Sequence, residues 1–448
     1  MYDSFENPSQ RSFLPDSSKK YNFNFLLPTI SGNFFLTGNS QASLKSRLFL
    51  GRYDDSVLKI NQGRYNHVNA NLNAYLVMFK MFASLNGDEE LGFAAQFRAE
   101  TKAQFSDESP AMFNGTGAFA NANYSNIFNN NYYFQMYDQL SLSYREKFNK
   151  QFSFGIKFSV LLGIDYQKTT ITSSSATIDK DNQTAFVALK GTGYASYVPG
   201  SFDARDFLPT FRNPGAAVSI GSTYRTEDGF TIQANIKDLG FIHWSKLSRT
   251  YNFDNSGPIQ GLDLQTREDS VFKRANTIIH KGGTVQSFTT PVDGFAEISV
   301  NRNFLLDDNG DFKYSPTLIA SKELFYPGFV AALVNPIQYK KYVLTLTTTY
   351  DDLKLFNVGL QFMIKKANSE FFIGSDKIAQ SIGLVSQSIN SSSPAVTQNG
   401  SFTGASFFIG YAVKFGALIE HPMNASVIPT GEKGFLGRLW GRWFKTNN

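Results

Sequence analysis

Long runs of alternating apolar and polar residues dominate this chain. In one of them, apolar Phe93 and Phe97 alternate with charged Arg98, Glu100 and Lys102. Because successive side chains of a strand point to opposite faces, one face of this run is apolar and the other is charged. The alternation lasts more than twice the roughly 5–6 residues of an ordinary strand. A tilted strand that crosses a bilayer needs about 9–11 residues, with lipid on one face and a wet lumen on the other.

A second long run, residues 152–166, repeats the pattern. Its predicted lipid face contains Phe154, Ile156, Phe158 and Val160, and its lumen face contains Lys157 and Asp165. Further strands are expected at 21–27, 33–38, 68–76, 140–148, 184–196, 216–225, 230–237, 295–303, 316–321, 328–334, 342–350, 355–365, 370–374 and 401–415. The pattern therefore predicts an all-β protein, an antiparallel transmembrane β-barrel of about 14–16 strands with a short C-terminal amphipathic helix.

A soluble β-sandwich is the alternative fold, since its strands also alternate between a core face and a water face. Sandwich strands are shorter, however, with turns about every 8–12 residues. The 44 Phe and 21 Tyr suit lipid-facing strands and interfacial girdles. The mean hydropathy is nevertheless slightly negative. A hydrated lumen inside an apolar outer wall predicts this combination.

Charge and reactive residues exclude several functional classes. A net charge of +5 over 448 residues, without a basic block before the C-terminus, argues against a nucleic-acid partner. The absence of cysteine removes disulfides and thiol-ligated metals. Asp307 and Asp311 resemble half a calcium loop, but Leu318 stands where the bidentate Glu is needed. We therefore expect no catalytic residues, no metal and no cofactor, and a protein that is not an enzyme.

Three segments are expected along the chain: an N-terminal segment 1–20, a barrel 21–415 and an extension 416–448. The N-terminal segment either plugs the lumen or lies in the periplasm, and a plug is slightly preferred. The chain starts without an apolar export signal, so we expect that signal to have been removed already and the protein to lie in a bacterial outer membrane. Long polar segments at 106–135, 246–291 and 376–400 are expected outside the cell. If every predicted strand crosses the membrane once, successive links lie on alternate sides. This count places the link 197–214 in the periplasm, unless a further strand lies there.

The C-terminal extension contains apolar residues at near-helical spacing and several cations. The apolar residues include Phe435, Leu439, Trp440 and Trp443, and the cations include Arg438 and Arg442. This pattern is typical of a basic amphipathic helix lying in a membrane interface, with a partner-binding helix as the alternative.

The lumen-facing charges Arg98, Glu100, Lys102, Lys157 and Asp165 have two interpretations. They either select ions or hold a plug, or they form a cross-strand ion network that fills the interior. Because their signs alternate instead of forming a ring of one sign, we favour the network.

Several short motifs resemble those of a known family. They are Asn7-Pro8-Ser9, Asn213-Pro214-Gly215, the run Lys237-Asp238-Leu239-Gly240-Phe241-Ile242-His243-Trp244, and the run Phe371-Phe372-Ile373-Gly374-Ser375-Asp376-Lys377-Ile378. Together they resemble an uncharacterised outer-membrane barrel family of the Bacteroidota, which is similar to FadL-like transport barrels and to PorV-like barrels of the type IX secretion system. The resemblance spans roughly residues 5–415. Trp244, at a strand end, is expected in the interfacial girdle.

The resemblance implies two roles. One is a non-enzymatic docking component of a surface-protein complex, linked to type IX secretion or gliding, whose partners are outer-membrane lipid and other outer-membrane or secreted surface proteins. The other is a FadL-like channel for hydrophobic solutes. The positions of the predicted strands that face the lumen carry Asn, Gln, Ser and charged residues. Such a lining suits water or a plug better than an apolar track, so the docking role is preferred.

Overall fold

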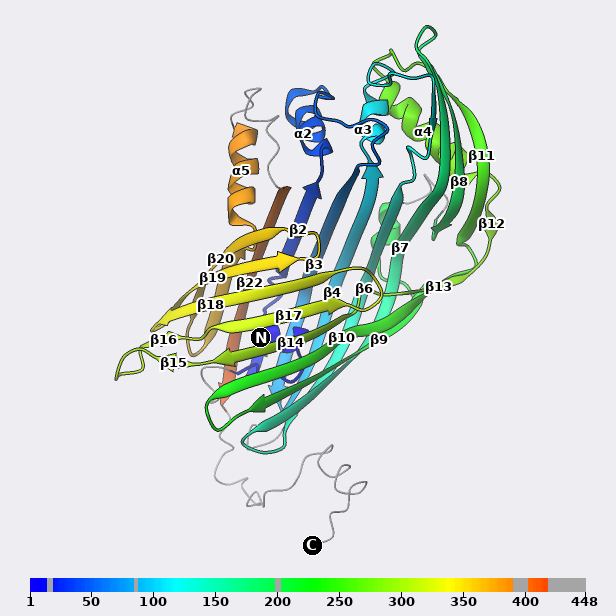
Figure 1. The fold of residues 1–448 in the computed structure, drawn as a ribbon. Helices are drawn as coiled ribbons and strands as arrows, with labels where there is room; N and C mark the ends of the chain where they lie inside the picture. The colour runs from blue at the N-terminus through cyan, green and yellow to red at the C-terminus, as the bar shows by residue number, and fades with distance from the viewer. Residues whose placement is uncertain (14–18, 84–87, 198–202, 390–401, 418–448) are drawn as a thin grey trace.

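A β-barrel forms most of the molecule. The computed structural model describes residues 1–13, 19–83, 88–197, 203–389 and 402–417. Within this part of the chain, fourteen antiparallel strands close the barrel, counting β1 and β2 as one (Figure 1). In barrel order they are β1 (Lys19–Phe23) with β2 (Thr29–Thr37), β3 (Tyr65–Phe82), β4 (Glu89–Ser106), β6 (Asn131–Lys147), β7 (Phe152–Asp179), β9 (Pro214–Arg225), β10 (Phe230–Trp244), β14 (Phe295–Arg302), β17 (Thr317–Glu323), β18 (Phe329–Tyr339), β19 (Tyr342–Asp351), β20 (Phe356–Lys365), β21 (Ser369–Ser375) and β22 (Thr403–Ala417).

The first and last strands seal the barrel. Both β1 and β2 pair with β3 on one side and with β22 on the other. Between them the chain kinks at Phe25 and Leu26, which have positive φ angles of 48° and 60°. The side chain of Asn24 bridges this kink, because its Oδ1 accepts a hydrogen bond from the backbone N–H of Met78 at 3.1 Å. The sheet thus closes without a free edge, as a barrel requires.

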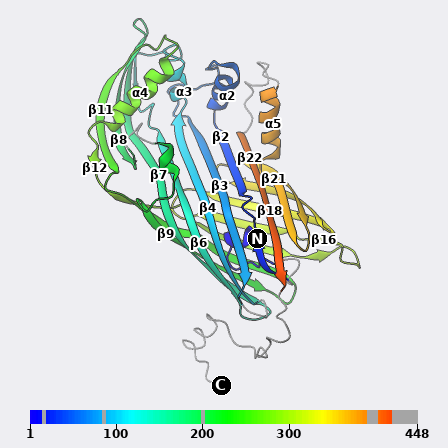
Figure 2. The same ribbon diagram turned by 180° about the vertical axis from the view of Figure 1, so that it is seen from behind.

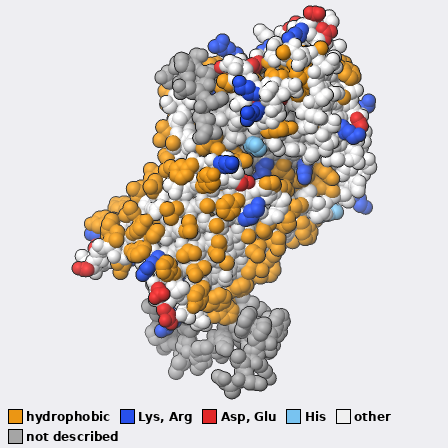
Figure 3. Space-filling view, viewed as in Figure 1, with side chains coloured by type: hydrophobic (Ala, Val, Ile, Leu, Met, Phe, Trp, Pro, Cys, Tyr) orange, Lys and Arg blue, Asp and Glu red, His pale blue; other side chains and the backbone are white. Residues whose placement is uncertain are grey.

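The two faces of the wall have opposite character. Outward side chains are apolar and exposed, with Phe158 59% and Phe93 40% accessible. On the face drawn in Figure 3, such side chains cover much of the strand region below the cap. Inward side chains are largely polar and buried. A sandwich would bury its apolar rows, so the arrangement overturns the soluble alternative and confirms the predicted barrel.

Short helices lie at the barrel's ends and inside it. They are α1 (Asp3–Glu6), α2 (Ser40–Leu50), α3 (Glu108–Phe113), α4 (Arg267–His280), α5 (Ile378–Ile389) and the 3-10 helix η1 (Ala204–Phe207). In the described ranges, no helix combines the length and apolarity needed to cross a membrane. The predicted C-terminal helix and its residues Phe435, Leu439, Trp440, Trp443, Arg438 and Arg442 lie outside the described residues.

Strand β7 is 28 residues long and extends well beyond the barrel. Its first half pairs with β6 and β9 in the wall (Figure 2). Its second half pairs with β8 (Thr184–Ala195) and β5 (Asn123–Ser125), and β8 pairs with β11 (Arg249–Ile259). Strand β8 is therefore outside the barrel, and β9 begins at Pro214 opposite Leu162 of β7, at the end of the wall nearer β8. The prediction that this link is periplasmic was wrong, because β8 does not cross the membrane.

The sheet beyond the barrel and the helices above it form a cap with its own core. Tyr251 and Phe253 of β11 belong to one buried hydrophobic cluster with Val271 and Ile278 of α4. Burial raises the pKa of the Asp55 carboxyl, although this group also accepts a hydrogen bond from Asn114 Nδ2 at 2.7 Å. The remaining short strands are β12 (Thr284–Val285), β13 (Phe288–Pro291), β15 (Phe304–Leu305) and β16 (Phe312–Tyr314). The cap is thus a folded unit and not a set of loose loops.

Candidate functional site

The centre of the lumen is organised around Asp238, a buried carboxylate on β10. Strand β10 pairs with β9 through a register shift between Ile236 and Leu239. Asp238 has a positive φ of 51° there, a conformation that Asp and Asn tolerate better than most residues. The bulge turns the Asp238 side chain into the lumen, where strict alternation from Lys237 would have pointed it at lipid.

Two cations from other strands meet this carboxylate. Arg98 Nη1 lies 2.7 Å from Asp238 Oδ2, and Lys157 Nζ lies 3.1 Å from Oδ1. Gln139 Nε2 and Ser219 Oγ also donate hydrogen bonds to Oδ1, at 3.0 and 3.2 Å. Arg98 Nη2 in turn binds Glu100 Oε1 at 2.6 Å. All of the charged members are nearly inaccessible to solvent.

Such a cluster can stabilise the barrel only as a unit. A buried charge is costly unless an opposite charge and further hydrogen bonds compensate its lost hydration. Asp238 has four such partners, from strands β4, β6, β7 and β9, so it ties neighbouring and distant strands together. The sequence interpretation of a cross-strand network accounts for Arg98, Glu100 and Lys157, and Asp238 is the member that it missed.

A second charged cluster crosses the lumen nearer the cap. Lys102 of β4 lies 2.9 Å from Asp293, and it also pairs with Glu323 at the end of β17. The Lys102 ammonium lies 4.9 Å from the centre of the Tyr326 ring. Asp293 and Glu323 come from the wall opposite β4, so Lys102 joins the two sides. Asp165 takes no part in either cluster, since it accepts hydrogen bonds from Ser196 Oγ at 2.6 Å and Gln167 Nε2 at 2.9 Å. The predicted lumen position of Asp165 was wrong, because a register shift in β7 pairs this residue with Met136 on the outer side of β6.

Aromatic residues fill the lumen above these charges. Trp244 is fully buried and donates from Nε1 to Thr290 Oγ1 at 2.8 Å. Its ring lies 5.4 Å from that of Tyr166, and Tyr133 and Tyr137 belong to the same buried cluster. The prediction of an interfacial girdle position for Trp244 was wrong, because the β10 bulge exchanges the faces of all later residues of that strand.

The N-terminal segment 1–13 occupies the lower lumen, and several wall strands hold it. Glu6 pairs with Lys237 and accepts a hydrogen bond from Tyr75 Oη at 2.6 Å. The carbonyl oxygen of Ser9 accepts a hydrogen bond from Arg145 Nε at 2.8 Å, and the ring of Phe13 stacks on the ring of Phe82, with 4.1 Å between the ring centres. These contacts come from strands β3, β6 and β10, so the segment is fixed to more than one side of the wall.

Two paired glycines make room for this segment. Gly155 of β7 and Gly221 of β9 are directly opposite each other across the strand pair. A Cβ on Gly155 would lie 2.1 Å from the carbonyl oxygen of Pro8, and one on Gly221 would lie 2.2 Å from Asn7 Oδ1. The backbone of the segment therefore rests directly on the wall, a contact that only glycine permits.

Substitution of Gly155 by valine is expected to displace the N-terminal segment while leaving the barrel closed, because the new side chain occupies the position of Pro8. Limited proteolysis of the purified protein in detergent should then cleave within residues 1–13. Gly117→Val is the control, since nothing lies within 4 Å of the added Cβ there. Equal protection of the segment in both variants would contradict this packing.

The predicted lipid-facing residues all lie at positions of their strands whose side chains point outward. Phe93, Phe158 and Val160 are exposed, and Phe97, Phe154 and Ile156 are partly accessible on the same face. The two glycines were missed by the sequence analysis, since nothing in their local sequence indicates what packs on them. The arrangement as a whole holds charges, aromatic rings and a chain segment in place inside the wall.

Solved structures that resemble this chain are outer-membrane barrels of low sequence identity. A Pseudomonas aeruginosa FadL homologue is 10% identical, with 92% of this chain and 98% of that chain covered and a TM-score of 0.40. The Ralstonia pickettii toluene transporter TbuX is 9% identical, with 92% of each chain covered and a TM-score of 0.41. The translocator domain of the autotransporter NalP from Neisseria meningitidis is 7% identical, with 90% and 91% covered and a TM-score of 0.36. At these values the likeness carries no inference about function.

Sequence comparison identifies the family directly. No curated protein matches the chain. The sequence profile of a family of unknown function, DUF5723, matches residues 15–376, which include thirteen of the fourteen barrel strands and most of the cap. This protein therefore belongs to the DUF5723 family.

Proposed function

We propose that this protein is a non-enzymatic barrel of a bacterial outer membrane whose closed lumen supports a cap that binds another surface protein. The observation that carries the proposal is the contrast between a lumen occupied by ion pairs and the N-terminal segment and a cap with its own hydrophobic core. A transport channel needs an open or openable path, whereas a scaffold needs a rigid base.

The continuity of β7 supports the scaffold role. The same strand forms part of the barrel wall and an inner strand of the cap sheet, between β5 and β8, so the orientation of the cap is set by the barrel. A partner bound to the cap would be held at a fixed height and angle above the membrane.

A stack of aromatic rings on the cap is the best docking candidate. Phe113 of α3 lies 4.6 Å from Phe272 of α4 and 6.3 Å from Tyr53. Phe272 is 55% exposed. Beside the stack, Arg47 of α2 binds Glu268 of α4 through Nε at 2.6 Å. Exposed aromatic rings held in ordered structure are typical anchors of protein interfaces.

Replacing Phe272 by aspartate is expected to reduce the amount of co-purifying partner at least about tenfold, as loss of an interface anchor does. The measurement is extraction in mild detergent followed by quantitative mass spectrometry of the bound proteins. Asn276→Asp, an exposed position on the same helix, is the matched control. An unchanged set of partners in the Phe272 variant would argue against docking through this stack.

The finer proposal is that the partner belongs to a type IX secretion or gliding complex. It rests on the resemblance of the Asp238-Leu239-Gly240 motif to an outer-membrane barrel family of the Bacteroidota, which is itself similar to PorV-like barrels. The proposed interfacial helix of the C-terminal extension, from Gly431 to Asn448, would add a second contact. Recovery of secretion or gliding proteins with the purified barrel tests this directly, and recovery of none of them would reject it.

A FadL-like channel for hydrophobic solutes is the second candidate. It is favoured by the irregular part of the wall opposite the β10 bulge, where residues 292–294 separate β13 from β14 and the N–H of Val292 still donates to the carbonyl oxygen of Gly240 at 3.1 Å. The toluene transporter TbuX and the FadL homologue are named for such a role or family. Uptake of a monoaromatic solute by liposomes that contain this protein would support the channel, whereas uptake equal to that of empty liposomes would support the closed scaffold.

A further inference from the structure

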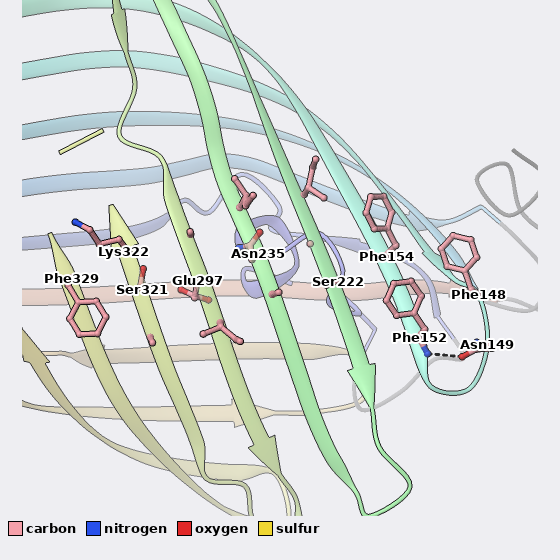
Figure 4. A pocket seen from close by; sticks show the side chains of 17 residues that line it. Phe148, Asn149, Phe152, Phe154, Ser222, Asn235, Glu297, Ser321, Lys322 and Phe329 are labelled. Atoms are coloured by element: carbon pink, nitrogen blue, oxygen red, sulfur yellow. Dashed lines mark hydrogen bonds between the residues drawn. The ribbon is translucent and has the colours of Figure 1, made fainter. Parts of the chain in front are cut away.

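A large hollow lies on the outer wall of the barrel, on the side that faces lipid. Its volume is about 1260 Å³, which exceeds the roughly 300–1,000 Å³ of most small-molecule pockets. Strands β7, β9, β10, β14, β17 and β18 form its floor, and Phe148 and Phe152 stand at one end (Figure 4). The lumen and the N-terminal segment lie behind these strands in the same view. The hollow is thus separate from the charged lumen site.

A row of small side chains explains the hollow. Strand register places Ser222, Ala234, Ile298 and Ala320 side by side across four strands, all on the outer parity. Elsewhere the outer rows are built from larger residues, such as Val77, Leu140 and Val160 around Ala95. Three of these four residues are small, and Ile298, which is 52% exposed, stands between Ala234 and Ala320. The hollow is therefore a trough with one low part over Ser222 and Ala234 and another over Ala320, with Ile298 between them. The trough runs across the strands, and it is apolar along its length.

One cation stands at the rim of this trough. Lys322 lies in the neighbouring outer row, between Ala296 of β14 and Phe329 of β18. It is exposed, and its ammonium donates one hydrogen bond to the carbonyl oxygen of Gly328 at 3.0 Å. The adjacent Glu323 points into the lumen and pairs with Lys102, so it does not neutralise Lys322. A lysine on the lipid face is unfavourable unless it lies close to the interface or meets an anion.

The cation decides which membrane component fits. Acyl chains are as apolar as the trough, so apolar contact alone would exchange one lipid for another without preference. A fixed ammonium favours lipids that carry phosphate. Lys322 lies at the end of β17 nearer the cap, which is the outer side in the orientation proposed above. The lipid must therefore belong to the outer leaflet.

We propose that this trough binds lipid A, the phosphate-bearing glycolipid of the bacterial outer leaflet. Acyl chains of the lipid lie over Ser222 and Ala234 on one side of Ile298 and over Ala320 on the other side, and a phosphate meets the ammonium of Lys322. The proposal shares the membrane orientation of the proposed function but does not depend on the docking role of the cap.

The test is titration of the delipidated, refolded protein with purified lipid A, followed by native mass spectrometry. Lys322→Glu is expected to weaken binding about tenfold or more, as loss of a charge-assisted contact does. The double variant Ala234→Phe with Ala320→Phe fills the trough and should weaken binding comparably while the barrel still folds, because phenylalanine suits a lipid-facing position. Heat-modifiable migration on gels verifies folding in each variant.

Two control variants and two control lipids make the result decisive. Lys341→Glu, at the opposite end of the barrel, and Ala95→Phe, on another part of the wall, should bind lipid A as the unmodified protein does. Dephosphorylated lipid A and phosphatidylglycerol should bind at least several-fold more weakly. The proposal is overturned if Lys322→Glu retains full affinity, or if either control lipid binds as tightly as lipid A.

Discussion

A barrel in which Ile156, Phe158 and Val160 are all replaced by arginine is expected to fail to insert into membranes. The three side chains lie in alternate positions of β7 on the outer face, where Phe158 is the most exposed. Each arginine at the lipid face near the bilayer midplane costs about 2–4 kcal/mol, so three cost about 6–12 kcal/mol, which is comparable with the whole stability of a typical fold at about 5–15 kcal/mol. Heat-modifiable migration and protease resistance in liposomes measure the loss.

The same strand supplies the control for this experiment. Thr172, Ser175 and Thr177 lie on the part of β7 that belongs to the cap and are exposed there. Three arginines at these positions should leave insertion unchanged, because the cap faces water. If the variant at 156, 158 and 160 assembled as efficiently as this control, the face assignment of β7 would be refuted.

Replacing Asp238 by alanine is expected to destabilise the barrel by about 3–5 kcal/mol, the usual cost of leaving a buried partner charge uncompensated. Lys157 would lose its carboxylate partner, Arg98 would lose one of its two, and Ser219 and Gln139 would lose an acceptor. Urea unfolding of the protein in lipid vesicles, followed by tryptophan fluorescence, measures the change. The midpoint should move to a clearly lower urea concentration.

Two further variants separate charge from geometry. The stability of Asp238→Asn should fall between that of the unmodified protein and that of Asp238→Ala, because asparagine tolerates the positive φ but carries no charge. Asp254→Ala removes an exposed partner of Lys190, and loss of this surface pair should leave the urea midpoint nearly unchanged. An Asp238→Ala barrel as stable as the Asp254→Ala barrel would show that the lumen cluster does not hold the wall together.

Alternation and length were sufficient to predict the barrel and most of its strands. Phe93 and Phe97 alternate with Arg98 and Glu100 over a length that spans a membrane, and the structure places these pairs on opposite faces of β4. The reason is local, since strand geometry alone sends successive side chains to opposite sides. The lipid face and the lumen face of β4, and of β7 as far as Leu162, therefore follow from neighbouring residues, whereas a register shift after Gly163 exchanges the faces of the later residues of β7.

Local alternation could not reveal where a strand changes register or leaves the barrel. The bulge before Leu239 exchanges the faces of the rest of β10, which brings Asp238 to the lumen centre and buries Trp244. Likewise β8 alternates as a barrel strand does, but it pairs with the part of β7 that has already left the wall. Both outcomes depend on which strand lies alongside, and this is not encoded in the alternation itself.

The sequence by itself determined the membrane-spanning wall, with an apolar outside and a polar inside, because side-chain direction in a strand depends on position along the chain. The tertiary structure alone decided which charges meet and what the two opposed glycines accommodate. It also decided where small residues line up as a trough, since each of these features joins strands that are far apart in sequence. Contacts of this kind arise from barrel closure and register, which only the pairing of all fourteen strands establishes in the described chain.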